Sequence, residues 1–383
     1  MNIEITKNFI RGWLIVMIFI ALVTIQGIQD QRQSHQMILM LSVMGLFSLI
    51  VKNIWVTAFM LWTIFLFSFF KFQGDTYLSN VFFGCILYFI TKISFKKEHI
   101  NLYINGFLWF IFANLAYMTV QRTGFDFIYT STLQNVYPIQ HVSNTKMDGF
   151  MGHRSIVGSL LAMGVPFLAA RESLMAKIAS VGLLIVLVFC NTSLCLLMGL
   201  IGLLFVLYYH LNRKILIGIT ILILAIGLLY LNKVDKLGTE RFIMWKKVMQ
   251  DYMIHPVTGY GLDSFANETK FKRFRYSQAI KDFRYGDKNS DERITNIDIW
   301  DNPHNLYISI LYEFGFIGMV IFICYMRQNI LNYVKSIKDR NTIALTGFVL
   351  VFLGLSMGHF PAFLAREMVY IIPLFTLWET SIA

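Results

Sequence analysis

Long apolar runs constrain the fold of this chain more than any other feature. Runs of about twenty apolar residues, the length that crosses a bilayer as a helix, recur along most of the 383 residues. The chain is 56% hydrophobic and 14% charged, whereas soluble domains carry roughly a quarter charged residues. We therefore expect an all-α polytopic membrane protein and not the series of soluble domains that length alone would suggest.

Twelve membrane spans describe the pattern best, although eleven or thirteen also fit it. The expected spans are 12–28, 37–51, 54–72, 78–94, 102–120, 154–170, 177–190, 194–210, 214–231, 305–325, 342–359 and 367–381. They make residues 1–383 a single integral membrane domain. The mostly polar segment 232–303 then forms a long loop between the ninth and tenth helices.

Lysine and arginine in the short loops predict the orientation, because such residues concentrate on the cytoplasmic side. With a cytoplasmic N-terminus, the cytoplasmic ends of the spans collect fourteen of these cations and the opposite short loops hold six. Both termini are therefore expected in the cytoplasm, and the segment 232–303 outside it. This orientation explains most of the net charge of +11, so we expect no nucleic-acid partner. The four cysteines fall in apolar runs without metal-ligand spacing, and no metal site is expected.

The long segment itself is nearly neutral, with 13 cations and 11 acids. A bound anion would therefore need particular cations and not a general positive field. One candidate is Arg241, at the start of a helical pattern that runs from Thr239 to His255-Pro256 and includes Trp245. Its guanidinium offers planar donors that suit a phosphoryl group, although an interfacial anchor is the simpler interpretation.

Two further stretches of this segment contain candidate binding residues. Gly259-Tyr260-Gly261 predicts a tight turn or a close backbone approach and lacks the remaining residues of a nucleotide-binding loop. Residues 270–276 mix aromatics with cations, among them Arg273 and Arg275. This mixture is typical of an interfacial segment that holds phosphates, and a solvated loop is the alternative.

His304 and Asn305 lie where the polar segment meets the apolar run that begins at Leu306. Polar groups near lipid need partners, so their presence there suggests a function, although most lone membrane histidines are structural. Glu313 follows within the same span and also needs a partner or water. Gly315 and Gly318, three residues apart, predict the close approach of a neighbouring helix.

These residues together resemble the superfamily of O-antigen ligases and Wzy-type polysaccharide polymerases. The shared pattern, in order, is Arg241, Trp245, Pro256, Gly259-Tyr260-Gly261, Phe265, Pro303-His304-Asn305, Glu313, Gly315 and Gly318. A weaker similarity surrounds His153 and Arg154, which resemble the segment that enters the sixth span of exopolysaccharide polymerases. One position departs from the ligases, because Leu194 stands where many of them have an arginine.

The resemblance implies a metal-independent glycosyltransferase of the GT-C type, without cofactor, in the bacterial cytoplasmic membrane. Its donor would be a glycan on undecaprenyl pyrophosphate, and its acceptor a second glycan for a polymerase or lipid A-core for a ligase. Arg241 and His304 would be catalytic, with Glu313, Trp245 and His153 in support.

Arg154, Arg273, Arg275, Asn305 and Tyr260 would bind pyrophosphate or glycan, and one of these arginines would replace the cation missing at Leu194. Membrane lipid and a chain-length regulator are expected partners. Leu194 and the similarity around His153 favour a polymerase. A lipid-linked oligosaccharide flippase is the alternative of another class, although no pair of related halves is evident.

Overall fold

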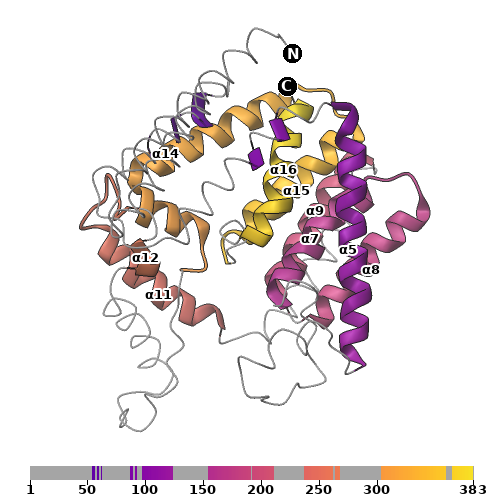
Figure 1. The fold of residues 1–383 in the computed structure, drawn as a ribbon, viewed down its shortest axis with the longest axis horizontal. Helices are drawn as coiled ribbons and strands as arrows, with labels where there is room; N and C mark the ends of the chain where they lie inside the picture. The colour runs from indigo at the N-terminus through magenta and orange to yellow at the C-terminus, as the bar shows by residue number, and fades with distance from the viewer. Residues whose placement is uncertain are drawn as a thin grey trace, which may run out of the picture. The chain divides into compact units, whose positions relative to one another are not determined.

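The computed structural model describes residues 97–123, 154–190, 192–210, 237–261, 264–267, 303–358 and 365–382, with a few positions between 54 and 92. Within these ranges all regular structure is helical (Figure 1). The helices longer than one turn are α5 (Ile100–Arg122), α7 (Arg154–Ala169), α8 (Leu174–Phe189), α9 (Ser193–His210), α11 (Leu237–Tyr252), α14 (Leu306–Lys335), α15 (Arg340–Leu355) and α16 (Ala365–Ile382).

Seven of the expected spans coincide with these helices, namely α5, α7, α8, α9, α14, α15 and α16. The all-helical prediction is therefore confirmed for the described residues. Lys97–Arg122, Ser193–His210 and Leu306–Lys335 are long and apolar enough to cross a membrane. Helices α7, α8 and α15 are apolar but shorter. The expected spans before residue 95 and at 214–231 lie largely or wholly outside the described residues, so the total of twelve stays a prediction.

The chain divides into two compact units, and α7 lies at the centre of the second. In this unit α7 contacts α5, α8, α9 and α15, and α15 also contacts α9 and α16. Most residues of α15 are buried, which agrees with a sequence that is apolar on all sides. One buried polar pair of this unit is the 2.9 Å hydrogen bond from the Trp378 indole to the Thr346 hydroxyl.

One end of this unit gathers the charged residues that flank its helices. Lys92 pairs with Glu379 at 3.0 Å, and the Arg340 guanidinium pairs with Glu172. At the other end of α15, the Asn305 side-chain amide donates to the Met357 carbonyl oxygen at 3.0 Å. The assignment of the end with the charged residues to the cytoplasm stays a prediction.

In the first unit, α14 is broken at Gly315, where φ is 69° and ψ is −171°. The break removes the regular bonds from the amides of Phe316 and Ile317 to the carbonyls of Tyr312 and Glu313. The loop 256–261 replaces them from both sides. The amides of Tyr260 and Gly261 donate to the Tyr312 and Glu313 carbonyls, and those of Phe316 and Ile317 donate to the Pro256 and Val257 carbonyls.

The role predicted for Gly315 therefore needs a correction. A Cβ atom on Gly315 would lie 2.2 Å from the Val257 carbonyl oxygen and 2.5 Å from the Gly259 nitrogen. The close neighbour is thus the backbone of a loop and not a second helix. Gly259 faces it with φ of 71°, so the turn and close approach expected at Gly259-Tyr260-Gly261 are confirmed.

Candidate functional site

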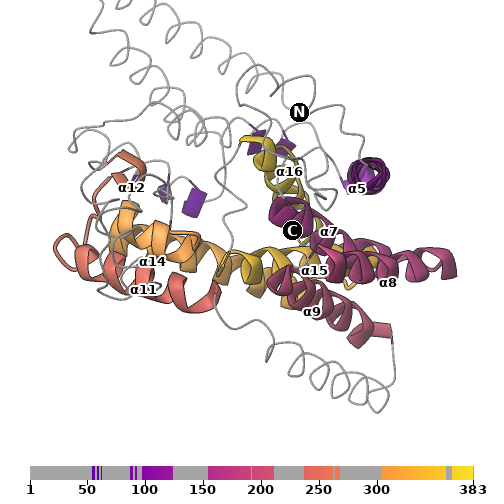
Figure 2. The ribbon, with the colours of Figure 1, turned by 90° about the horizontal axis from the view of Figure 1, so that it is seen from below.

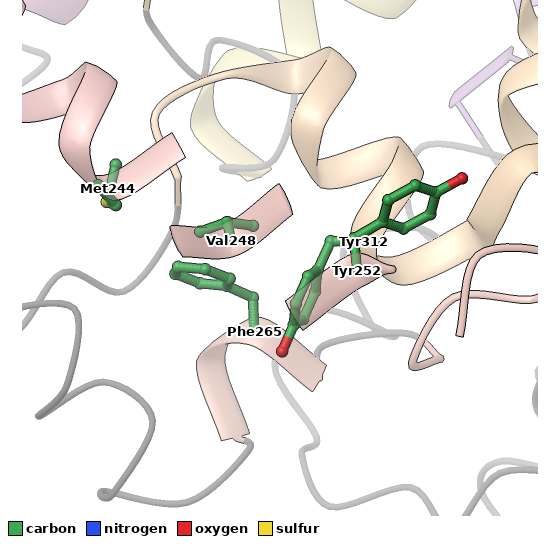
Figure 3. Close-up of a cluster of buried hydrophobic side chains, with 5 residues drawn as sticks. All are labelled: Met244, Val248, Tyr252, Phe265 and Tyr312. Atoms are coloured by element: carbon green, nitrogen blue, oxygen red, sulfur yellow. The ribbon is translucent and has the colours of Figure 1, made fainter. Parts of the chain in front are cut away.

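Helix α11 carries Arg241 and packs through one apolar face. Met244, Val248 and Tyr252, spaced four residues apart, are buried together with Phe265 and Tyr312 (Figure 3). This face fixes α11 against α14 and the short helix α12 (Ser264–Asn267). Burial raises the pKa of the Tyr252 phenol, whose hydroxyl donates to the Pro256 carbonyl at 2.9 Å. Phe242 of the same helix is also apolar, but its side chain is 65% exposed.

Arg241 lies on the half-buried border of this helix, one turn before Trp245. Residues four apart are neighbours on a helix surface. The Trp245 indole nitrogen donates a 2.7 Å hydrogen bond to the carbonyl oxygen of Pro303, the residue that precedes His304 in the chain. Lys246 and Lys247 of the same helix are exposed. The structure thus attaches α11, next to Arg241, to the segment that leads into His304.

His304 has an unusual backbone conformation. Its φ of 49° is positive, and it is the only residue other than glycine with a positive φ among the described residues. Such a conformation is strained for most side chains, and strain of this kind concentrates at functional sites. The side chain is half-buried.

The residues after His304 are fixed to the end of α15. The Asn305 amide donates to the Met357 carbonyl, and the Leu306 amide donates to the Ser356 carbonyl at 2.9 Å. Asn305 itself is buried, at 7% exposure. The turn that contains His304 is therefore held by both backbone and side-chain bonds.

Tyr260 is engaged within the protein. Its ring stacks on Tyr312 with 4.8 Å between centroids, and the edge of His255 meets it at a similar distance. Its hydroxyl donates to the Asp251 carbonyl at 2.9 Å. These contacts assign Tyr260 to the support of the loop 256–261, and binding of substrate by its ring stays a prediction.

Glu313 is buried at 6% exposure, two residues before the break in α14. Its main-chain carbonyl accepts from Gly261 at 3.0 Å. The buried Glu313 carboxyl thus lies within a few residues of the helix break and of the bond to the loop 256–261. A buried ionisable group in such a position fits a supporting role in a polar site.

The remaining candidates are described in part or not at all. His153, Arg273 and Arg275 lie outside the described residues. Arg154 is the first residue of α7, and its side chain is not described. Leu194 lies in the first turn of α9 beside Thr192, whose buried hydroxyl packs next to Gly158. The cation that replaces the arginine missing at Leu194 thus stays open.

Sequence reasoning missed several supporting groups. The Pro303 carbonyl, the stacked Tyr312 and the Ser356–Met357 turn all hold candidate residues in place. No local signal identifies the two carbonyls, since any residue has one. Tyr312 could have been suspected, because an aromatic with a polar group within a span often has a partner for it.

The apolar helices and the anchored His304 turn together describe an all-helical membrane protein. Residues 156–323 match the family model described as O-antigen ligase. This match confirms the resemblance to the O-antigen ligase and Wzy-type superfamily. It includes Arg241, His304 and Glu313 and begins just after Arg154. The search of curated proteins found no match.

Proposed function

We propose that this protein is a polysaccharide polymerase of the outer face of the bacterial cytoplasmic membrane. In the reaction, an acceptor sugar hydroxyl attacks the anomeric carbon of a glycan carried on undecaprenyl pyrophosphate. The new glycosidic bond forms as the bond to the pyrophosphate oxygen breaks. Pyrophosphate is a good leaving group, so cations that offset its developing charge can take the place of a metal.

Arg241 is proposed to hold the pyrophosphate, because a guanidinium stays charged and donates in a bidentate manner. His304 is proposed to accept the proton of the acceptor hydroxyl, since an imidazole titrates near neutral pH. Asn305 and Glu313 would position the His304 imidazole. Arg154, Arg273 or Arg275 would supply a second cation.

The hydrogen bond between Trp245 and Pro303 supports this proposal more than any other observation. One helical turn separates Arg241 from Trp245, and one peptide bond separates Pro303 from His304. Arg241 is therefore one helical turn from the donor of this 2.7 Å bond, and His304 follows its acceptor in the chain.

Surface glycan from a deletion strain tests polymerisation directly. Cells that lack a polymerase would display single repeat units on the acceptor, and cells that lack a ligase would display none. Complementation by the intact gene should restore the ladder of long chains on a gel. A deletion strain whose acceptor carries no glycan at all would favour the ligase that transfers glycan to lipid A-core. This test is needed because the family match does not separate the two activities.

A lipid-linked oligosaccharide flippase is the second candidate, because a broken helix with satisfied backbone groups also occurs in transporters. Purified protein in detergent distinguishes the two. Elongation of a lipid-linked glycan without sealed vesicles would support the polymerase. Movement of the glycan across vesicles without chain growth would support the flippase.

A further inference from the structure

A cavity of about 830 Å³ lies in the second unit, at the end where the charged residues gather. It is bordered by one face of α5, the last turn of α7, the turn into α8 and the start of α15. Figure 2 shows α5 along its axis, and within this unit α5 contacts α7. The volume of the cavity is within the range of roughly 300 to 1,000 Å³ that is typical of sites for small molecules.

The wall that α5 contributes changes character along the helix. Asn101 and Asn105 line the cavity near the first turns, and Leu108, Trp109 and Phe112 line it further along. The spacing places all five on one helix face. This order, from amide to hydrocarbon along a helix that is long enough to cross a membrane, matches the order of a lipid from headgroup to chain.

The mouth of the cavity carries both signs of charge. Arg171, Glu172, Asp339 and Arg340 line it. The Arg171 guanidinium donates to the Asn105 side-chain oxygen through one of its nitrogens, and a guanidinium has five N–H donors. The Glu172 carboxylate pairs with Arg340 and is 72% exposed. The two cations and two acids of the lining balance, and Lys97 pairs with Asp339 at 4.0 Å beside them. A ligand that carries both signs can meet Arg171 with its anion and Glu172 with its cation.

We propose that this cavity binds a zwitterionic glycerophospholipid with a primary ammonium headgroup. The phosphodiester lies against Arg171, the ammonium against Glu172, and an acyl chain along Leu108, Trp109 and Phe112. The exposed fraction of Trp109, 74%, leaves its ring accessible to hydrocarbon. The predicted orientation places this site in the cytoplasmic leaflet, away from the proposed chemistry.

Native mass spectrometry of the full chain tests this site. The protein is extracted in mild detergent and mixed with vesicles of equal parts phosphatidylethanolamine and phosphatidylglycerol. We expect retention of phosphatidylethanolamine over phosphatidylglycerol. Arg171→Gln should lower this retention about tenfold, because a charge-assisted bond to phosphate is lost. Glu172→Gln should lower it as well and reduce the preference over phosphatidylglycerol.

Two further variants control for folding and for charge. Ala176→Phe fills the cavity without a change of charge and should reduce retention of both lipids. Lys177→Gln removes an exposed cation from the same turn, outside the cavity, and should change nothing. Equal retention of the two lipids by the unaltered protein, or equal effects of Arg171→Gln and Lys177→Gln, would overturn the proposal.

Discussion

The Trp245 indole donates a 2.7 Å hydrogen bond to the carbonyl oxygen of Pro303, 58 residues further along the chain. This bond joins a residue of the helix α11 to the last residue of the polar segment 232–303. It attaches the helix of Arg241 to the residue before His304, and five buried side chains hold that helix in place. The attachment gives several variants definite expected outcomes.

Trp245→Phe removes the indole donor and keeps an aromatic ring in the same place. A hydrogen bond of this kind contributes about 0.5–1.5 kcal/mol, so we expect glycan elongation to fall roughly two- to tenfold while the fold is kept. Elongation of a lipid-linked glycan by purified protein measures the effect. Lys247→Gln, on the exposed side of α11, is the control. Elongation unchanged in Trp245→Phe would show that the bond is dispensable.

Arg241→Lys keeps a positive charge and loses the planar pair of donors. We expect polymer formation to fall at least about tenfold, because a lysine binds a phosphate as a point charge only. Arg241→Ala should abolish it. Gel analysis of surface glycan, at matched protein levels, measures both variants, with Lys246→Gln as the comparison. Long glycan in cells that carry Arg241→Ala would remove arginine from the mechanism.

His304→Asn separates catalysis from backbone strain. Asparagine adopts positive φ more easily than most residues, so the turn at φ 49° should persist. The free energy of unfolding, measured by thermal unfolding, should stay within about 0.5 kcal/mol of that of the unaltered protein. Glycan elongation should be lost, because the imidazole is absent. His304→Ala adds strain and is harder to interpret. Normal elongation by His304→Asn would contradict the proposed proton transfer.

Gly315→Ala should destabilise the protein strongly. The conformation at Gly315, with φ of 69° and ψ of −171°, is one that glycine alone adopts readily, and it costs other residues about 1–3 kcal/mol. The clash with the Val257 carbonyl adds to that cost. Gly106→Ala is the matched control, because a Cβ there has no atom within 4 Å. Thermal unfolding in detergent measures both, and equal midpoints would contradict the broken helix.

Asn305→Asp should be worse than Asn305→Ala. The amide of Asn305 donates to the Met357 carbonyl, and alanine loses this bond at a cost of about 1 kcal/mol. A buried carboxylate would instead face a carbonyl oxygen and lose a further 1–3 kcal/mol, roughly. Thermal unfolding of the two variants tests the order. A more stable Asp variant would mean that another donor faces this position.

Much of the fold was predictable from local patterns. The boundaries of α9 at Ser193 and His210 agree with the expected span 194–210, because hydrophobicity and flanking charge are properties of neighbouring residues. The start of α14 after Asn305 agrees in the same way. Its end at Lys335 lies ten residues beyond the expected span, because the run 326–335 mixes polar and apolar residues that a helix accommodates equally well.

The candidate site was predictable only as a set of residue types. His304 and Asn305 were identified by their position at the edge of an apolar run, and Arg241 by its charge at the start of a helix. Their supports were not predictable, since Met357 and Pro303 contribute only a backbone oxygen. The buried face of α11 was not predictable in detail, because Phe242 and Met244 are both apolar, yet Met244 is buried and Phe242 is 65% exposed.

The sequence by itself determined that the chain forms apolar helices, which of their ends carry charge, and that Gly259-Tyr260-Gly261 makes a turn. Only the tertiary structure decided that α14 breaks at Gly315. A continuous helix satisfies its own backbone groups, so a break is stable only when other groups replace the lost bonds. The loop 256–261 supplies four such bonds, and the partners are more than fifty residues apart in the chain. Hydrophobic patterns contain no information on that pairing.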